Sequence, residues 1–301
     1  MRKANTLKDL IKSVARKELL LPLLRDFLAK EEAATTSGKV SKKAGVIHDA
    51  ELTVKTFQAR IGEFNHGEDP EGKFFHPSTI GACQRMMFFD HYQATRDAGK
   101  VNEDDLLRRY LIFETGTYIH VMFQNLCERA GFLIQRECAI VDRMRKILGH
   151  ADGKLRIDGK VYVLEIKTIN SKGFQMLHDS PKHEHKAQAH AYMRSLNVKH
   201  AIFIYYNKDQ NSLREFVVDY DHSFYLEHVR RRIDGYFTAI DRKVIPPQEG
   251  TNPRSFPCMF CPFTKVCWES GRADAFLRQI KSAKYQALIK DLSHAKTSAK
   301  A

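Results

Sequence analysis

The sequence predicts an α/β fold built around a mixed sheet, and two observations support this. Strand-like apolar runs alternate along the chain with helix-like segments: strands are expected at 132–141, 161–168, 201–206 and 215–220, and helices at 106–131, 183–196 and 221–243. The dipeptide Asp158-Gly159 is a two-residue turn signal that makes 161–168 one arm of a β-hairpin. The 301 residues, 43% of them apolar, are enough to bury such a core.

The chain is expected to divide into three parts. Residues 1–60 predict an N-terminal helix and linker, because apolar residues recur at helical spacing up to Leu24 and residues 31–43 are small, polar and charged. Residues 77–270 are expected to form the main domain. Residues 271–301 are expected to form a basic C-terminal helix or tail.

Two helices are expected before the first strand. Ser78 or Thr79 would cap a short helix that carries Cys83 in its first turns. The second helix is the segment 106–131, which contains His120 and would end at Gly131. A histidine at such a position is more often a half-buried structural residue than a metal ligand. The apolar face of this helix is predicted to comprise Leu111, Tyr118, Ile119, Met122 and Leu126.

The hairpin turn predicts the pairing of every residue in its two arms. A two-residue loop pairs Ile157 with Lys160, and counting outward places Asp152 opposite Glu165. Opposed residues share a face of the sheet with β-carbons about 4.5 to 5.5 Å apart, and Lys167 points the same way. Two carboxylates and a lysine are therefore predicted to converge.

This acidic cluster has two interpretations. Two adjacent carboxylates repel unless a positive charge lies between them, so the arrangement suits a hard divalent cation. The alternative is a solvated hairpin with surface charges. The apolar run 161–164 before Glu165 favours the cation site, because buried central strands have this pattern and exposed hairpins do not.

The helix at 183–196 carries Gln188 and Tyr192 on one face, four residues apart. Several histidines lie nearby, but their spacings fit no zinc pattern, and a polar helix face is expected instead. These histidines are His178, His183, His185 and His190.

The chain is basic, with 49 Lys and Arg against 36 Asp and Glu for a net charge of +13, which suggests a polyanion such as nucleic acid as partner. Residues 230–232 are three arginines on the helix at 221–243, which Pro246-Pro247 is expected to end. Such a patch suits phosphates and solubility equally. No apolar run approaches the roughly eighteen residues that span a bilayer, and no secretory signal is found.

Three of the six cysteines follow one another as C-x2-C-x5-C at Cys258, Cys261 and Cys267. This clustering indicates metal ligation in a reducing compartment rather than a disulfide framework. Zinc and an iron-sulfur cluster each need four ligands, and Cys83 is the best placed of the remaining cysteines. Cys127 and Cys138 lie in periodic apolar segments and are expected in the core.

Taken together, these motifs resemble the PD-(D/E)XK nuclease superfamily, specifically RecB-like exonucleases with an iron-sulfur cluster, such as the CRISPR-associated RecB-like nucleases and the AddB nuclease domain. The resemblance covers residues 77–268, and its separated motifs occur in the family's order. It implies a restriction-endonuclease-like mixed central sheet flanked by helices, with a cysteine-ligated cluster as a clasp. The residues before Asp152 read Gly-His-Ala and lack the proline of the superfamily's name.

The resemblance also implies roles for individual residues. His120, Asp152, Glu165 and the Ile166 carbonyl would hold Mg²⁺ or Mn²⁺, and Lys167 would complete the E-x-K motif. Gln188 and Tyr192 match the family's Q-x-x-x-Y helix and, with Arg85, would contact DNA. The cluster ligands would be Cys83, Cys258, Cys261 and Cys267, holding a 4Fe-4S cluster or, alternatively, zinc.

The expected function is metal-dependent exonuclease hydrolysis of DNA, on single-stranded or unwound ends in recombination, repair or replication. An endonuclease of the same superfamily and a non-catalytic nucleic-acid-binding scaffold are the alternatives. No helicase motif is present, so a helicase or recombination partner would be a separate chain. A reducing, cytoplasmic location is expected, and a viral origin is left open.

Overall fold

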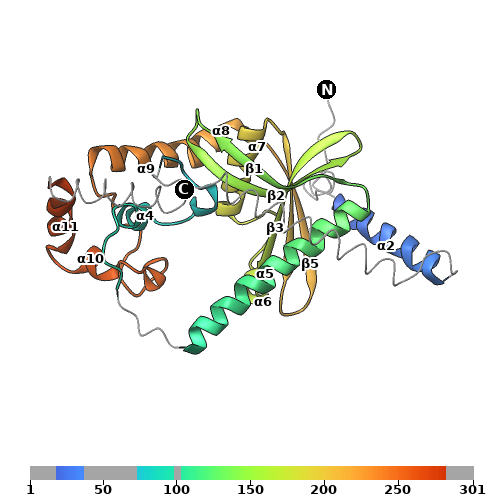
Figure 1. The fold of residues 1–301 in the computed structure, drawn as a ribbon, viewed down its shortest axis with the longest axis horizontal. Coiled ribbons are helices and arrows are strands. Elements are labelled where there is room, and N and C mark those ends of the chain that lie inside the picture. Colours follow the sequence, from blue (N-terminus) through green and yellow to red (C-terminus); the bar gives the residue numbers. More distant parts are fainter. Residues whose placement is uncertain (1–17, 37–72, 98–102, 283–301) are drawn as a thin grey trace, which may run out of the picture.

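Five strands form one mixed sheet in the order β1-β2-β3-β4-β5 in the computed structural model, which describes residues 18–36, 73–97 and 103–282 (Figure 1). The β3–β4 pair is parallel, and the other neighbours are antiparallel. The predicted mixed sheet is confirmed. The strands are β1 (Leu133–Asp142), β2 (Ile147–Ile157), β3 (Lys160–Ile169), β4 (His200–Asn207) and β5 (Ser212–Asp219).

The β2–β3 hairpin has the predicted register. Ile157 pairs with Lys160, and the ladder continues to Gly153 opposite Leu164. Asp158 and Gly159 have φ angles of 48° and 76°, as a type I′ turn requires. The ladder stops one step short of Asp152, so β2 leaves β3 at that residue.

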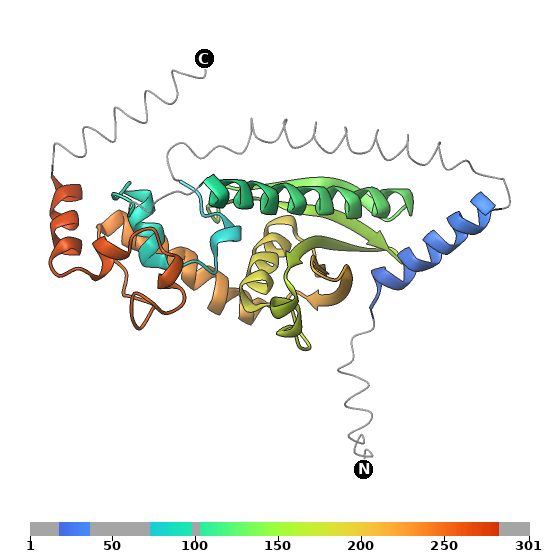
Figure 2. The same ribbon diagram turned by 90° about the horizontal axis from the view of Figure 1, so that it is seen from below.

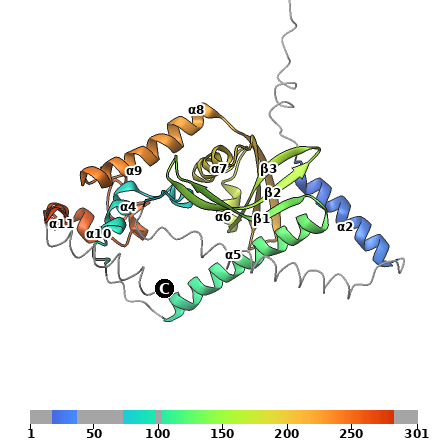
Figure 3. The same cartoon turned by 45° about the horizontal axis from the view of Figure 1, so that its top comes forward.

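The parallel β3–β4 pair requires a crossover, which α6 (Ser171–Gln175) and α7 (His183–Leu196) supply. Figure 3 shows α7 against one face of the sheet. The polar helix face predicted for the histidines is wrong for His190, which is fully buried. Its spacing could not reveal that α7 lies between the sheet and further helices.

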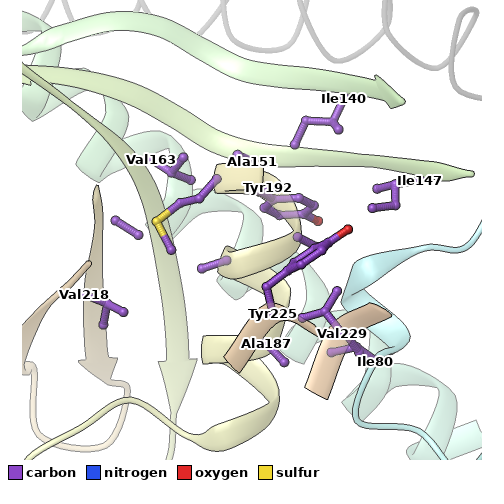
Figure 4. Close-up of a cluster of buried hydrophobic side chains, with 14 of the residues drawn as sticks. Ile80, Ile140, Ile147, Ala151, Val163, Ala187, Tyr192, Val218, Tyr225 and Val229 are labelled. Carbon is purple, nitrogen blue, oxygen red and sulfur yellow. The ribbon is translucent and has the colours of Figure 1, made fainter. Parts of the chain in front are cut away.

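The core on this face is completed by the helical segment after β5, which consists of α8 (His222–Phe224), the π-helical turn η2 (Tyr225–Arg230) and α9 (Arg231–Arg242). In Figure 4, Tyr192 of α7 lies among side chains of β2 and η2, including Ala151 and Val229. α9 ends at Arg242 because Lys243 takes the left-handed conformation. The predicted end of this helix at residue 243 is confirmed to within one residue, but the turn at Lys243 ends it before Pro246-Pro247 is reached.

The opposite face of the sheet is covered by α5 (Glu103–Arg129) and α2 (Leu20–Thr36). Figure 2 shows α5 and α7 on opposite sides of the sheet. The predicted apolar face of α5 is partly wrong, because Leu111, Tyr118 and Met122 are 53%, 60% and 49% exposed. α5 carries two apolar stripes, and the sheet packs on the one with Ile119, Phe123 and Cys127. Among the described helices, none is long and apolar enough to cross a membrane.

α2 shows that part of the predicted linker is helical, because residues 31–36 belong to this helix. Its first turn is held by Glu215 of β5. The Glu215 carboxylate accepts hydrogen bonds from the backbone N–H groups of Leu19, Leu20 and Leu21 at 2.7 to 3.1 Å. Predictions for residues 1–17, 37–60 and 283–301 lie outside the described residues.

A third core cluster joins residues far apart in the sequence at the end of the molecule away from α2 (Figure 1). It includes residues of α4 (Gln84–His91), α10 (Thr264–Trp268) and α11 (Arg272–Lys281). The short helix η3 (Cys258–Phe260) precedes α10 in the chain. Ser78 and Thr79 do not cap α4, because they lie in a separate 3-10 turn, η1 (Pro77–Thr79). Cys83 occupies the N-cap position of α4 instead of its first turns.

Removing the Glu215 carboxylate should detach α2 from the sheet. The variant Glu215→Ala leaves three N–H groups at the helix start without acceptors, so its free energy of unfolding should fall by about 1–3 kcal/mol. Chemical denaturation measures this, with Glu269→Ala at an exposed position as the control. Equal stabilities of the two variants would contradict the anchoring role.

Candidate active site

β3 carries Glu165 and Lys167 two residues apart, so their side chains share the face of the sheet on which α7 packs. The Glu165 side chain is 2% exposed. Lys167 Nζ lies 2.8 Å from Glu165 Oε2 and forms a buried ion pair with it. The sequence thus places a charged pair on the central strand β3, on the face that α7 covers.

Asp152 lies where β2 leaves β3, and its carboxylate takes over a hydrogen bond that a strand carbonyl would otherwise accept. Asp152 Oδ2 accepts from the backbone N–H of Ile166 at 2.5 Å. Its Oδ1 lies 2.9 Å from His120 Nδ1 on α5. The structure therefore brings His120, Asp152 and the Glu165–Lys167 pair to one place.

Burial and the charges of neighbouring groups shift the pKa values of Glu165, Asp152 and Lys167. Burial raises the pKa of Glu165 to about 7, and the negative charge of Asp152 adds to this effect while Lys167 opposes it. Burial acts to raise the pKa of Asp152 too, but the charge of His120 and the hydrogen bonds to the carboxylate lower it overall. Burial acts to lower the pKa of Lys167, and its two carboxylate neighbours raise it overall.

One oxygen of this cluster has no partner among the described residues. Glu165 Oε1 is buried and makes no hydrogen bond with any of them, which is costly for a carboxylate. A divalent cation would supply that partner, and carboxylate oxygens with an imidazole nearby suit Mg²⁺ or Mn²⁺. Across the described ranges, no group of three or more His, Cys, Asp or Glu side chains has the spacing of a formed metal site.

α7 contributes Gln188 and Tyr192 to the cluster. Lys167 Nζ donates to Gln188 Oε1 at 3.1 Å, and Gln188 Nε2 donates to the Tyr192 hydroxyl at 3.1 Å. Tyr192 is only 1% exposed, and burial raises its pKa, so it stays a neutral phenol. Gly149 allows this packing, because a β-carbon there would lie 3.0 Å from the Tyr192 hydroxyl. Tyr192 thus reaches the cluster through Gln188.

Gln124 was not identified from the sequence. It follows His120 by one helical turn and is completely buried. Its Nε2 donates to the backbone carbonyl of Asp152 at 2.8 Å and to Glu137 Oε1 at 2.7 Å. Gln124 therefore fixes the main chain at the point where β2 leaves β3. Its spacing from His120 was the signal that could have found it.

The four cysteines of the predicted clasp line one cavity of about 220 Å³. Burial raises the pKa of the Cys261 thiol, and the neighbouring Cys83, Cys267 and Cys258 add to this effect. All are free thiols. The structure gathers them without showing the cluster clasp itself. Cys127 and Cys138 are buried in the core, as expected.

Arg85 lies with the cysteines rather than with Glu165. Its guanidinium lines the cysteine cavity, donates to the Pro246 carbonyl at 3.1 Å and lies 5.7 Å from the centre of the Phe89 ring. The structure therefore separates Arg85 from Gln188 and Tyr192.

No protein-family model matches this sequence, and no curated protein matches it. Solved structures give weak likenesses. The structure of SSO0001 is 18% identical, covers 72% of this chain and 94% of its own, and has a TM-score of 0.43. An alkaline exonuclease from Laribacter hongkongensis is 12% identical, with coverages of 57% and 89% and a TM-score of 0.39. Its complex with dAMP is 13% identical, with coverages of 58% and 90% and a TM-score of 0.40. Likenesses at these scores carry no functional conclusion for this chain.

The raised pKa of Glu165 predicts a pH-dependent stability difference in buffer without divalent cations. Because this pKa rises from 4.5 to about 7 on folding, the folded wild type binds the proton more tightly and loses stability as pH rises through this window. The variant Glu165→Gln lacks this loss. Between about pH 5 and about pH 8 it should gain about 2 kcal/mol relative to wild type in chemical denaturation.

The matched control is Glu269→Gln, at an exposed position. It should follow the wild-type pH dependence. Parallel curves for wild type and Glu165→Gln would refute the raised pKa.

Proposed function

We propose that this protein is a metal-dependent deoxyribonuclease of the PD-(D/E)XK type that hydrolyses phosphodiester bonds as an exonuclease at strand ends. The buried Glu165 carboxylate with its unpartnered Oε1, beside Asp152 and Lys167, supports this most strongly. A buried carboxylate oxygen without a partner lowers the stability of a fold, but it is available to bind a cation. The net charge of +13 favours a polyanionic substrate.

His120, Asp152, Glu165 and the Ile166 carbonyl would hold one or two divalent cations. Bound Mg²⁺ or Mn²⁺ supplies Lewis acidity, which polarises the phosphate and lowers the pKa of a bound water. The protein's contribution is to fix these ligands: Asp152 is held by the Ile166 N–H and by His120. Gln124 holds the main chain of Asp152.

Lys167 is the candidate for stabilising charge on the phosphate. Its ammonium group is fixed between Glu165 and Gln188 and remains protonated, because its pKa is raised. A fixed positive charge in a buried site is worth more than the same charge in water. Gln188 positions Lys167, and Tyr192 positions Gln188, which explains why a buried tyrosine belongs to this site.

The four thiols are proposed to hold a 4Fe-4S cluster, with zinc as the alternative ion. Their common cavity supports this, because four soft ligands from two distant parts of the chain surround one space. Cys83 comes from the start of α4, and the other three come from residues 258–267. Such a cluster would tie the two parts together as a structural clasp.

The variant Glu165→Gln should abolish DNA cleavage and leave DNA binding largely intact, because it removes a cation ligand and keeps the shape of the side chain. The assay is digestion of end-labelled linear DNA with Mg²⁺ or Mn²⁺ and with a chelator control. Glu269→Gln is the matched control and should cut at the wild-type rate.

Cleavage at the normal rate by Glu165→Gln would end the nuclease proposal for this site. Circular DNA separates the two kinds of nuclease: an exonuclease leaves it intact, whereas cutting of closed circles would assign endonuclease activity.

Protein purified without oxygen should be brown from the cluster, and Cys258→Ala should lose the colour. Cys138→Ala is the control, because Cys138 is buried in the main core away from the four thiols, and it should keep the colour. Metal analysis completes the test. A colourless protein with stoichiometric zinc would assign the zinc alternative, and a protein without either would refute the clasp.

A further inference from the structure

A hollow of about 760 Å³ is lined by Lys167 and Gln188 of the candidate active site. Residues from the loop after η1, from α7 and from η2 line it too, together with Arg231 and Arg232. Its volume is within the about 300–1,000 Å³ typical of ligand sites. A hollow of this size can hold part of a single strand.

Two histidines and two arginines, His183, His228, Arg231 and Arg232, line this hollow. The rings of His183 and His228 are perpendicular, with centres 4.6 Å apart. The pKa of His183 is lowered by burial first, and then by the charges of His228, Lys186 and Arg232, against the opposing charge of Glu184. A bound anion would counter these effects and favour the protonated form of His183.

Two acidic residues of the hollow, Glu249 and Glu227, have cationic partners in it, and Arg231 is not one of these partners. Glu249 lies 3.3 Å from Arg232 and also accepts the backbone N–H of Gln84. Glu227 lies 3.8 Å from His228. The Arg231 side chain is exposed and makes no ion pair or hydrogen bond with any described residue.

The structure separates the three consecutive arginines that the sequence presents as one patch. Arg230 forms an ion pair with Asp234 at 2.7 Å and lines a different hollow, with Arg145 and Lys146. Arg232 is bound to Glu249 and to the Ala82 carbonyl. Only Arg231 of the three lines the active-site hollow without a partner among the described residues.

We propose that Arg231, beside His183 and His228, is a phosphate-binding subsite for a single DNA strand whose scissile bond lies at Glu165 and Lys167. This inference rests on the proposed nuclease function and adds the form of the substrate. Phosphate contacts of this kind set the register of a strand without reading its sequence. Phe256, which is 79% exposed, lines the same hollow and offers a ring on which an unpaired base can stack.

The test compares Arg231→Gln with the adjacent control Arg230→Gln. Binding of a labelled single-stranded oligonucleotide is measured by fluorescence anisotropy with a chelator present, so that no strand is cut, over a series of salt concentrations. Arg231→Gln should weaken binding about three- to tenfold and reduce the slope of log K against log salt by about 0.7, the value for one phosphate on a single strand. Arg230→Gln should keep the wild-type slope. Thermal unfolding verifies that both variants fold.

Equal slopes for the two variants would overturn the subsite. Equal binding of a blunt duplex, with the same dependence on Arg231, would overturn the assignment to a single strand. Failure of the nuclease proposal is distinguishable, because it appears as absent cleavage by wild type with Mg²⁺ or Mn²⁺, while the slopes are measured without cleavage.

Discussion

The burial of Glu165 in the central strand is the constraint on which the rest of the site depends. A buried carboxylate is costly unless it is paired and hydrogen-bonded, and the net cost in proteins is several kcal/mol per ion. Lys167 provides one partner, but Asp152 brings a second negative charge to the same place, and Glu165 Oε1 has no hydrogen bond to any described residue. The fold therefore holds two carboxylates beside one ammonium and the His120 imidazole, and this arrangement supports the proposed cation site. Helices pack on both faces of β3 and bury Glu165, while Lys167 stays at the edge of the hollow.

The second feature that forms the site is the end of the β2–β3 pairing before Asp152. Side chains of β3 point alternately to the two faces, so a fully paired sheet would separate Glu165 from anything on α5. The opening of the hairpin at Asp152 removes this separation. The Asp152 carboxylate occupies the gap between β2 and β3, where it contacts the Ile166 N–H within the sheet and His120 of α5. Gln124 holds the main chain of the opened segment. Residues from both sides of the sheet can thus act at one point.

The parts of this architecture that local chemistry determines were predictable from the sequence. The Asp158-Gly159 turn sets the hairpin register without help from distant residues, and α7 has the predicted bounds. The parts that depend on tertiary packing were not predictable. α5 has two apolar stripes, and only the position of the sheet decides that Ile119 is buried and Tyr118 exposed. The contact of Gln124 with the Asp152 carbonyl and the separation of Arg85 from the acidic cluster follow from where the helices lie. No spacing rule encodes such placements.

The cysteine cavity and the active-site hollow share a wall. Gly81 and Ala82, from the turn before α4, border both, and so do Glu249 and Phe256 from the segment that leads to Cys258. Gly81 packs closely against α7, because a β-carbon at this position would lie 2.7 Å from Glu184. A metal held by the four thiols would fix α4 and residues 258–267 relative to each other and would thereby fix Phe256 and the border of the hollow. Ligation at the cysteines would affect the hollow only by holding these residues in place, and it would need no electron transfer. A structural cluster and a hydrolytic site can therefore belong to one domain.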